Sequence, residues 1–402
     1  MEVMALPSYQ EALASALGVV SPNHGSESVS LQNAIGRVLS NDIVADRNLP
    51  PYNRSKMDGY AVVASEVSRG VSLQVIGHVV AGTIFDGKHQ QNTCVTIATG
   101  APVPDGFDAV VPHEQTDKGE ELVRFDLDEV NVGASIHRCG VDASAGDVLI
   151  PSRTVLKPHH VGIAASVGDG KIKVVPRPRV IIVSSGDEVV LPPNVPLQHQ
   201  IRNSNSPMTN AVFTALGCDI VESHHIPDDP EATNATVERA LDGRAEILVT
   251  IGGISAGDRD YFPAAFDHAG VSLVVTGARI QPGKPVMVGD HAHGIVLGLP
   301  GNPVSALACS CVFGWPIVLA LLGVSPDLPW EQRALKHQVK PNPNRTAFRP
   351  CAIQDGAIVV PSWQGSGDLS HTASTDGLVQ LPPSNCMVDA NEEVPFLPWP
   401  WR

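Results

Sequence analysis

The chain has 402 residues, and at about 150 residues per domain this length predicts two to four domains. Its 27 Lys and Arg against 42 Asp and Glu give a formal net charge of −15, which disfavours binding to nucleic acids and to anionic membrane surfaces. The seven cysteines are an odd number without a CxxC pair, so they predict reduced thiols in the cytoplasm, not a disulfide framework or a zinc site.

The first part of the chain changes from helical to β-like patterning. Apolar residues recur at helical spacing over residues 8–39 and again over 158–167. Between them, residues 44–148 hold short β-like runs broken by Gly, Pro and Asp, at 71–80, 93–98, 109–112 and 122–125. We therefore expect a β domain at 47–145, inserted into a discontinuous helical domain made of residues 1–46 and 146–176.

The second part alternates strands and helices. After the Pro-rich linker 175–178, strand-like runs occur at 180–184, 218–223, 246–251 and 294–297, with helical segments between them. This alternation predicts a doubly wound α/β domain with a parallel sheet over 177–325. Short strands and prolines over 326–402 predict a small β-barrel or sandwich.

One apolar run, residues 304–324, has about the length of a membrane-spanning helix. Gly314 and Pro316 interrupt it, and no basic cluster flanks it. These features favour a buried helix of the α/β domain, and no membrane partner is expected.

Three strand-to-helix turns of the α/β domain are candidates for ligand binding. In open parallel sheets, ligands lie beyond the carboxyl ends of the strands, where helix N-termini attract anions. The glycine-rich second turn matches neither GxGxxG nor the P-loop pattern, but its small residues permit close approach to a phosphorylated ligand. Taken singly, each turn is also compatible with simple helix capping. The candidate binding residues are Ser185, Gly186 and Glu188 in the first turn, Gly252, Gly253, Ser255 and Asp260 in the second, and Pro300, Gly301, Asn302 and Ser305 in the third.

Charged residues near these turns suggest a metal-assisted phosphate site. Glu188, Asp228 and Asp260 are candidate ligands of Mg²⁺, because this hard cation takes oxygen ligands and bridges phosphate oxygens. Lys284, in the segment QPGKP, is a candidate contact for an anionic substrate, although a single lysine is more often a solvated surface residue. The sequence contains no HExxH, the pattern of many zinc peptidases.

Nine segments in collinear order resemble the MoeA family, which includes the C-terminal domain of gephyrin. They are MDGYAV, TGAPVP, HEQT, GVDASAG, SSGDE, SNS, GGISAGDRDY, QPGKP and LPGNPVS. The resemblance implies a discontinuous helical domain with an inserted β domain, a MogA-like α/β domain and a C-terminal β-barrel, assembled as a homodimer. It also implies a molybdopterin molybdenumtransferase, which binds adenylylated molybdopterin and molybdate, cleaves the pyrophosphate link with Mg²⁺, releases AMP and leaves molybdenum on the dithiolene sulfurs.

The resemblance also assigns roles to residues of this chain. Asp58, Thr99, Asp142 and Lys284 would be catalytic, with the first three reaching the site from the partner subunit to handle molybdate or assist hydrolysis. Glu188 and Asp260 would lie at the pterin and metal end, and the second turn would cradle the ligand. A molybdopterin adenylyltransferase that supplies the substrate and molybdoenzymes that receive the product are the further partners implied.

Four positions depart from the usual family pattern. Asn53 stands where Asp is frequent, Lys56 where a small residue is common, Val141 where Glu is frequent and Gln281 where Lys is frequent. These changes alter the local field that an oxyanion would experience, so the preference between molybdate and tungstate stays open.

Two other functions remain as alternatives. A CinA-like nucleotide pyrophosphatase would share GGxSxGxxD-type loops but lack the MDGYAV and TGAPVP segments. A non-catalytic molybdopterin-binding scaffold is disfavoured by the retained Asp58, Glu188 and Asp260.

Overall fold

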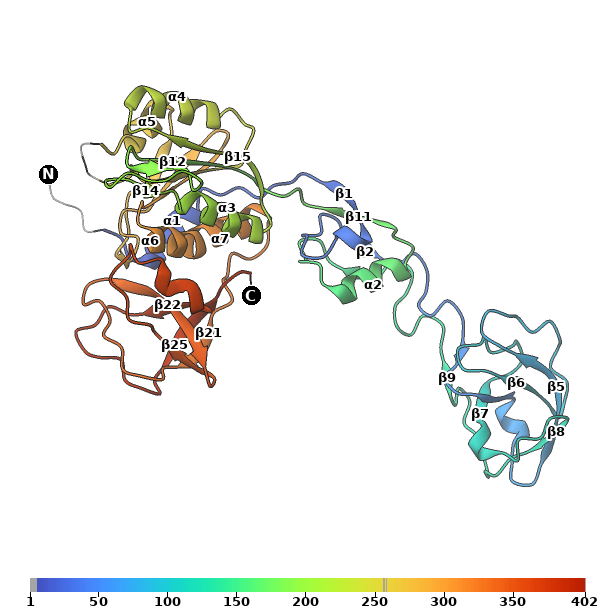
Figure 1. The fold of residues 1–402 in the computed structure, drawn as a ribbon. Helices are drawn as coiled ribbons and strands as arrows, with labels where there is room; N and C mark the ends of the chain where they lie inside the picture. The colour runs from blue at the N-terminus through green and yellow to red at the C-terminus, as the bar shows by residue number, and fades with distance from the viewer. Residues whose placement is uncertain (1–5, 256, 258, 402) are drawn as a thin grey trace. The chain divides into compact units, whose positions relative to one another are not determined.

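The computed structural model describes residues 6–255, 257 and 259–401, and they form two compact units (Figure 1). Unit 1 comprises Met1–Glu27, Gly36–Ser40 and Lys173–Arg402, and unit 2 comprises Ser28–Ile35 and Asn41–Ile172. Each unit has its own hydrophobic core, so each is described by itself.

A six-stranded sheet forms the centre of unit 1. Its strand order is β15 (Asp219–Ile226), β12 (Arg179–Ser185), β16 (Ile247–Ile251), β20 (Gly294–Leu299), β19 (Met287–His291) and β17 (Ser272–Val275). The first four strands are parallel and correspond to the four predicted runs, which confirms the α/β architecture. Strands β19 and β17, which extend the sheet beyond β20 through antiparallel pairs, were not predicted. All five residues of β16 are buried, as expected for a parallel strand covered on both faces.

Helices cover both faces of this sheet (Figure 1). One face packs against α4 (Pro230–Ala240) and α5 (Phe262–His268). The other packs against α3 (Asn205–Ala215) and the continuous helical run of α6 (Pro303–Cys309), the π-helical turn η4 (Ser310–Gly314) and α7 (Trp315–Leu321). This run, Pro303–Leu321, is long and apolar enough to cross a membrane, but 83% of its most apolar window is buried inside the protein. The prediction of a buried core helix is therefore confirmed.

The amino-terminal helix α1 (Tyr9–Leu17) belongs to the core of unit 1. Ser8 and Glu11 form a capping box at its start, which satisfies two of the free N–H groups. Its apolar face packs against the α/β core through Tyr9, Ala12 and Ala16.

The prediction of helix over 8–39 is confirmed for α1 and is wrong beyond it. The chain continues as coil into β1 (Glu27–Ser30) and the short 3-10 helix η1 (Leu31–Asn33). Pro22 and Gly25 oppose helix propagation here, and the helical spacing of the apolar residues was not sufficient to override them.

The C-terminal part of unit 1 is a small β-barrel. Its strand order is β18 (Ile280–Gln281), β22 (Thr346–Gln354), β24 (Gly377–Leu381), β25 (Glu393–Pro398) and β21 (Glu331–Ala334), with β23 (Ala357–Val359) paired to β22. A bridge between Leu335 and Ile358 joins the end of β21 to β23 and closes the sheet on itself. The expected barrel is thus confirmed. The 3-10 helix η5 (Ser370–Ser374) lies in the connection between β23 and β24.

Unit 2 contains the inserted β module and α2 (Pro158–Ser166). The module is a five-stranded sheet in the order β7 (Ala109–Pro112), β4 (Gly59–Val62), β6 (Thr93–Ile97), β5 (Ser72–Val79) and β8 (Leu122–Arg124). Four of these strands lie within the predicted β-like runs. All four residues of β4 are buried, and apolar clusters lie on both faces of the sheet. Short 3-10 helices η2 (Ala64–Glu66) and η3 (His113–Gln115) follow β4 and β7.

The remaining strands form two-stranded ladders. They are β1 with β11 (Lys171–Val174), β2 (Ile43–Val44) with β10 (Val148–Ile150), β3 (Arg54–Ser55) with β9 (Ile136–His137), and β13 (Val189–Val190) with β14 (Ile201–Arg202).

Candidate active site

A cavity of about 630 Å³ lies in unit 1, at the carboxyl ends of β12, β16 and β20. Its size is within the usual range for small-ligand sites. All three strand-to-helix turns that were predicted to bind ligand contribute residues to its wall. The predicted residues that line it are Ser185, Gly186, Glu188, Asp228, Gly252, Gly253, Ser255, Asp260, Pro300, Gly301 and Asn302.

Strand register explains why the turns meet. Ser184 of β12 is paired with Ile251 of β16, and Ile251 is paired with Leu299 of β20, so the three strands end at one edge of the sheet. Beyond that edge, the Gly252 N–H donates to the Leu299 carbonyl at 3.0 Å, which holds the second turn against the third.

The second turn depends on glycine at Gly253. Its φ is +59°, and a Cβ there would meet the Ser185 Oγ and the Phe262 ring at 3.0 Å. A side chain would therefore push the first two turns apart. Glycine at this position brings the backbone of the second turn close to the ligand space.

Charged side chains of both signs line the cavity. Its acidic groups are Glu188, Asp228 and Asp260, and its basic groups are Arg202 and Arg259. The Asp260 carboxylate accepts a hydrogen bond from the Gly257 N–H at 2.8 Å. The three acidic groups would repel an anionic ligand unless a cation lies between them and the ligand.

The first turn and the start of α4 are joined through two aspartates. The Asp228 N–H donates to the Asp187 carboxylate at 3.1 Å, and the Asp187 N–H donates to the Asp228 carboxylate at 3.4 Å. Arg259 lies 3.5 Å from Asp187, so the second turn also contacts this pair. These contacts hold Asp228 at the cavity wall.

The acidic groups fit one type of Mg²⁺ site. Among the described residues, no group of three or more His, Cys, Asp or Glu side chains is arranged to hold a metal alone. Mg²⁺ is commonly held by one or two carboxylates, water and substrate phosphates, without an all-protein cage. Asp228 and Asp260 in the cavity wall suit that arrangement, in which the substrate supplies part of the coordination.

The third turn is held by a segment of the C-terminal barrel. Asn302 precedes α6 but makes no side-chain cap; its Nδ2 donates to the Ser366 Oγ at 2.9 Å. The Val304 N–H donates to the Ser366 carbonyl at 3.0 Å, and Gly367 lines the cavity. The barrel therefore supplies part of the wall.

Asn205, at the start of α3, leaves an open acceptor in the cavity wall. Its Nδ2 donates to the Gly301 carbonyl at 2.6 Å, which fixes the orientation of the amide. Its Oδ1 is buried and has no hydrogen-bond partner in the protein. A buried acceptor without a partner is costly, so a ligand N–H or a water would satisfy it.

Two predicted site residues do not line the cavity. Ser305 is buried inside α6, with 3% of its surface exposed. Lys284 is exposed, and only the adjacent Pro285 contributes to the wall. The structure therefore places Ser305 in the packing of the helix and Lys284 next to the cavity.

The remaining three predicted residues lie in unit 2. The Asp58 carboxylate accepts a hydrogen bond from the Thr99 N–H at 2.7 Å, so the structure brings these two together. This backbone hydrogen bond, with a smaller contribution from the Thr99 hydroxyl, holds the pKa of Asp58 below its usual value. Both Asp142 carboxylate oxygens lie 2.9 Å from the His137 Nε2.

Several residues of the cavity wall were not predicted as site residues. Those with polar groups or from another domain include Arg202, Asn203, Asn205, Arg259 and Gly367. The first three lie in or next to the SNS segment, and Arg259 lies within the GGISAGDRDY segment. Both segments were among the motifs shared with the MoeA family, so the sequence pointed to these regions but not to the individual residues. Gly367 lies in the C-terminal domain, and none of the motifs singled out in the sequence contains it.

Comparison with known proteins identifies the family. Three family models match in succession: the MoeA N-terminal region (domain I and II) over residues 7–168, a probable molybdopterin binding domain over 181–320, and the MoeA C-terminal region (domain IV) over 332–399. The chain belongs to the MoeA family. The cavity lies mainly in the second of these MoeA segments, and Gly367 lies in the third.

Individual MoeA relatives match over nearly their whole length. The chain is 31% identical to a molybdopterin molybdenumtransferase of Synechocystis sp., covering 94% of this chain and 96% of the relative. It is 35% identical to molybdopterin molybdenumtransferase 2 of Mycobacterium tuberculosis, covering 88% and 90%. A solved molybdopterin biosynthesis MoeA protein from Pyrococcus horikosii superposes with a TM-score of 0.84 at 28% identity, covering 98% of this chain and 99% of that one.

Proposed function

We propose that this MoeA family protein is a molybdopterin molybdenumtransferase, which inserts molybdate-derived molybdenum into adenylylated molybdopterin. The observation that carries the proposal is the cavity at the sheet edge, which is formed mainly by the segment similar to a probable molybdopterin binding domain. The names of the Synechocystis and Mycobacterium relatives support the same activity. In the reaction, water would cleave the pyrophosphate link of the substrate and AMP would leave. The two dithiolene sulfurs would bind the molybdenum of molybdate and give up their protons, while one molybdate oxygen leaves with these protons as water.

The turns of unit 1 would bind the substrate. Gly252, Gly253 and Ser255, which line the cavity, would bring backbone and hydroxyl groups close to the pyrophosphate, and the third turn would present the start of α6 to it. Arg202 and Arg259 supply positive charge to the same wall. Lys284, beside the cavity, would add positive charge at its rim.

Asp228 and Asp260, with Glu188 nearby, would hold Mg²⁺ together with the substrate phosphates. When bound, Mg²⁺ would neutralise phosphate charge and polarise the bond that breaks. The Gly257 N–H, by its hydrogen bond to Asp260, keeps that carboxylate oriented for this role.

We further infer that the site is completed in a homodimer, by unit 2 of the partner subunit. Asp58, Thr99 and Asp142 match MoeA motif positions but lie in unit 2, whereas the cavity is formed by unit 1. Because the pKa of Asp58 is lowered, its carboxylate is ionised at neutral pH. An ionised carboxylate accepts hydrogen bonds and would orient water or a protonated oxyanion oxygen for the exchange at the metal.

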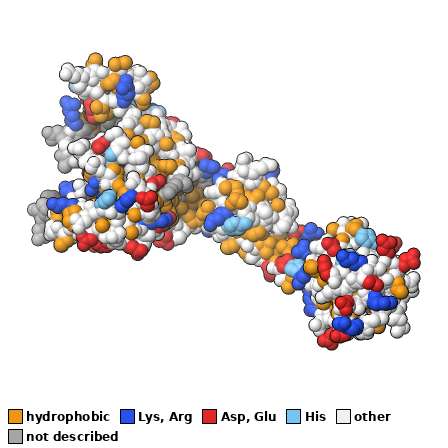
Figure 2. Space-filling model, turned by 60° about the horizontal axis from the view of Figure 1, so that its bottom comes forward, with side chains coloured by type: hydrophobic (Ala, Val, Ile, Leu, Met, Phe, Trp, Pro, Cys, Tyr) orange, Lys and Arg blue, Asp and Glu red, His pale blue; other side chains and the backbone are white. Residues whose placement is uncertain are grey.

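The protein is proposed to act in the cytoplasm. All seven cysteines are free, which suits a reducing compartment. The net charge of −15 disfavours binding to anionic membrane surfaces, and the face that Figure 2 shows carries both acidic and basic side chains. The partners would be a molybdopterin adenylyltransferase, which supplies the substrate, and the molybdoenzymes that receive the finished cofactor.

AMP release tests the proposal directly. Purified protein is given adenylylated molybdopterin and Mg²⁺, with molybdate, with tungstate or with neither, and the product is used to reconstitute a cofactor-free molybdoenzyme. We expect oxyanion-stimulated AMP release and active reconstituted enzyme. Asp260→Asn should abolish release, whereas Asp267→Asn, an exposed carboxylate on α5, serves as the matched control.

Other outcomes would favour the alternatives. AMP release from unrelated nucleotide adducts, independent of oxyanion, would indicate a CinA-like pyrophosphatase. Binding of the adduct without AMP release under any metal condition would indicate a scaffold. The ratio of rates with molybdate and tungstate would decide which metal this chain prefers.

A further inference from the structure

A buried polar network lies directly beneath the first turn of the cavity. At its centre is Ser184, the residue of β12 paired with His225 of β15. The Ser184 Oγ accepts hydrogen bonds from the Asn203 Nδ2 at 3.1 Å and from the Ser206 hydroxyl at 2.9 Å. It lies 2.9 Å from the His225 Nδ1. Ser184 and Asn203, which are 3% and 5% exposed, also line the cavity, whereas His225 is not among the lining residues.

The contacts of His225 define its tautomer. Its Nε2 lies 3.0 Å from the carbonyl oxygen of Gly186, which can only accept, so Nε2 carries the proton and donates. In the neutral ring Nδ1 is then the acceptor, and it takes the hydrogen of the Ser184 hydroxyl. The other acceptor near this hydroxyl, the His224 carbonyl, is farther away at 3.4 Å. The Ser184 oxygen thus donates once and accepts twice, which uses its full hydrogen-bonding capacity.

The Gly186 carbonyl is the point at which this network reaches the ligand turn. Gly186 lines the cavity with a φ of +143°, in a region that favours glycine. Its carbonyl also accepts the Val189 N–H at 3.2 Å, which closes the turn that carries Glu188. The two ring nitrogens of His225 therefore fix two points of one turn, Ser184 at its start and Gly186 at its centre.

We propose that His225 is a positioning residue that holds the 184–188 turn, and with it Ser185, Gly186 and Glu188, in the geometry that binds substrate. It acts as a neutral Nε2–H ring with one acceptor arm and one donor arm. It is not among the residues that line the cavity. Its effect on turnover rests on the proposed function, whereas its effect on the turn is a property of the free protein.

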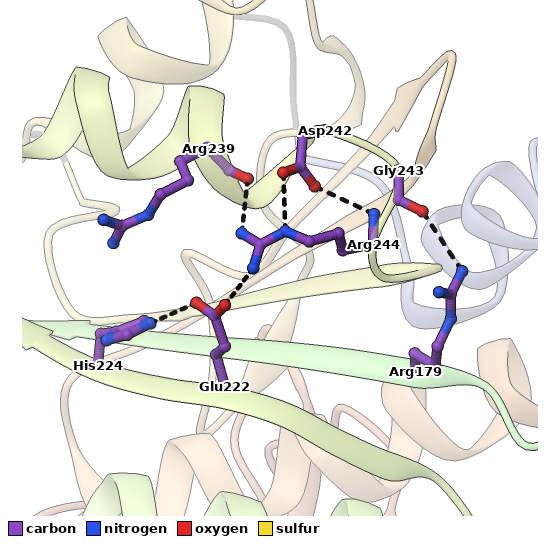
Figure 3. A network of polar contacts seen from close by, with 7 residues as sticks. All are labelled: Arg179, Glu222, His224, Arg239, Asp242, Gly243 and Arg244. Carbon is purple, nitrogen blue, oxygen red and sulfur yellow. Dashed lines mark hydrogen bonds and ion pairs between the residues drawn. The ribbon is translucent and has the colours of Figure 1, made fainter.

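Three substitutions separate the contributions of the two His225 hydrogen bonds, one with Ser184 and one with Gly186. His225→Gln places an amide N–H near the position of Nε2 and keeps the donor to Gly186. His225→Asn places a carbonyl near the position of Nδ1 and keeps the acceptor for Ser184. His225→Phe fills a similar volume with neither group. The matched control is His224→Asn, because the side chain of this neighbouring histidine contacts Glu222 in a separate network with Arg244 (Figure 3).

Hydrogen exchange of a peptide covering residues 184–190 measures the turn in the free protein. We expect His225→Phe to lose the protection of this peptide, His225→Gln to keep most of it and His225→Asn to fall between them. Because displacement of reacting groups by about 1 Å can cost about a hundredfold, we expect kcat/KM for AMP release to fall about a hundredfold in His225→Phe. It should recover to within about tenfold of the natural protein in His225→Gln and stay within about twofold in His224→Asn.

The proposal is overturned if His225→Phe keeps both protection and activity, or if His225→Gln is as impaired as His225→Phe. Should His225→Phe fail to fold, the Gln and Asn variants decide, and equal protection in the two would overturn the proposal. If the natural protein releases no AMP, the proposed function fails, and the exchange measurement still decides the role of His225.

Discussion

Replacing Gly283 by alanine should destabilise unit 1 for two separable reasons. Gly283 belongs to the QPGKP turn that carries Lys284, and its φ is +103°. A Cβ on this residue would lie 2.3 Å from the Sγ of Cys309, a fully buried residue of α6. Real Cβ atoms do not approach other atoms so closely, so either the turn or the helix must move.

The two costs have different magnitudes. Placing a side chain at positive φ costs about 1–2 kcal/mol, and overpacking a core typically costs about 1–3 kcal/mol. The free energy of unfolding should therefore fall by about 2–5 kcal/mol in Gly283→Ala. Gly270→Ala is the matched control, because its φ is +76° and no atom lies within 4 Å of its new Cβ. This control should lose only the first contribution, about 1–2 kcal/mol.

A double-mutant cycle with Cys309→Ala isolates the overlap. Removing the sulfur should reduce the cost of Gly283→Ala to about that of Gly270→Ala, a coupling energy of about 1–3 kcal/mol. Urea unfolding followed by tryptophan fluorescence reports on unit 1 alone, because all five tryptophans lie in it: Trp315, Trp330, Trp363, Trp399 and Trp401. The steric argument would be refuted if Gly283→Ala lowered the free energy of unfolding equally with and without the Cys309 sulfur. It would also be refuted if Gly283→Ala lowered this free energy no more than Gly270→Ala does.

Three further results follow from the structure. In the native protein only Cys139 and Cys386 should react rapidly with a thiol reagent, because the other five cysteines are buried; titration with and without denaturant should give two and seven thiols. The folded pKa of Asp58 is lowered, so its carboxylate stabilises the fold above the unfolded pKa of about 3.9, and this contribution is lost as pH falls through the folded pKa. Calorimetry should therefore show a gap in melting temperature between the natural protein and Asp58→Asn that is largest above about pH 5 and closes on acidification; a gap independent of pH would contradict this. Ser366→Ala removes the hydrogen bond from Asn302 and should raise the KM for adenylylated molybdopterin about fivefold, the effect of about 1 kcal/mol, while kcat changes little; a fall in kcat alone would argue against a binding role.

Much of the α/β domain could be predicted because its signals are local. The parallel strands are continuous apolar runs bounded by Gly, Ser and Asp, and the glycine-rich turns follow them directly in the sequence. Strands β17 and β19 were missed, since 272–275 and 287–291 are short and β19 ends in Gly-Asp-His, which lacks apolar character. Pairing to β20 stabilises β19 in the sheet, and this pairing is a tertiary effect.

The site prediction was also limited by tertiary contacts, which local sequence patterns do not contain. The turn residues were predicted because the carboxyl ends of parallel strands meet at one edge. Ser305 was assigned to the site from its place in the LPGNPVS segment, but its side chain is directed into the helix packing. The contribution of Ser366 and Gly367 depends on how the barrel packs on the α/β core, and the roles of Asn203 and His225 depend on hydrogen bonds across three chain segments. Spacing along the sequence can mark such a segment, but it does not show which side chains of distant segments meet.

The place of α1 in the core sets an order of events during synthesis. The Tyr9 hydroxyl donates to the carbonyl of Val312, 303 residues later, and the Tyr9 ring packs against Phe313 and Phe348. At translation rates of about 5–20 residues per second, the helix would wait on the order of 15–60 seconds for these partners. Residues 41–172 of unit 2 leave the ribosome during that interval and contain their own core. The Tyr9 side chain therefore remains without these three partners until residues 312–348 are made, well after the core of unit 2 is complete.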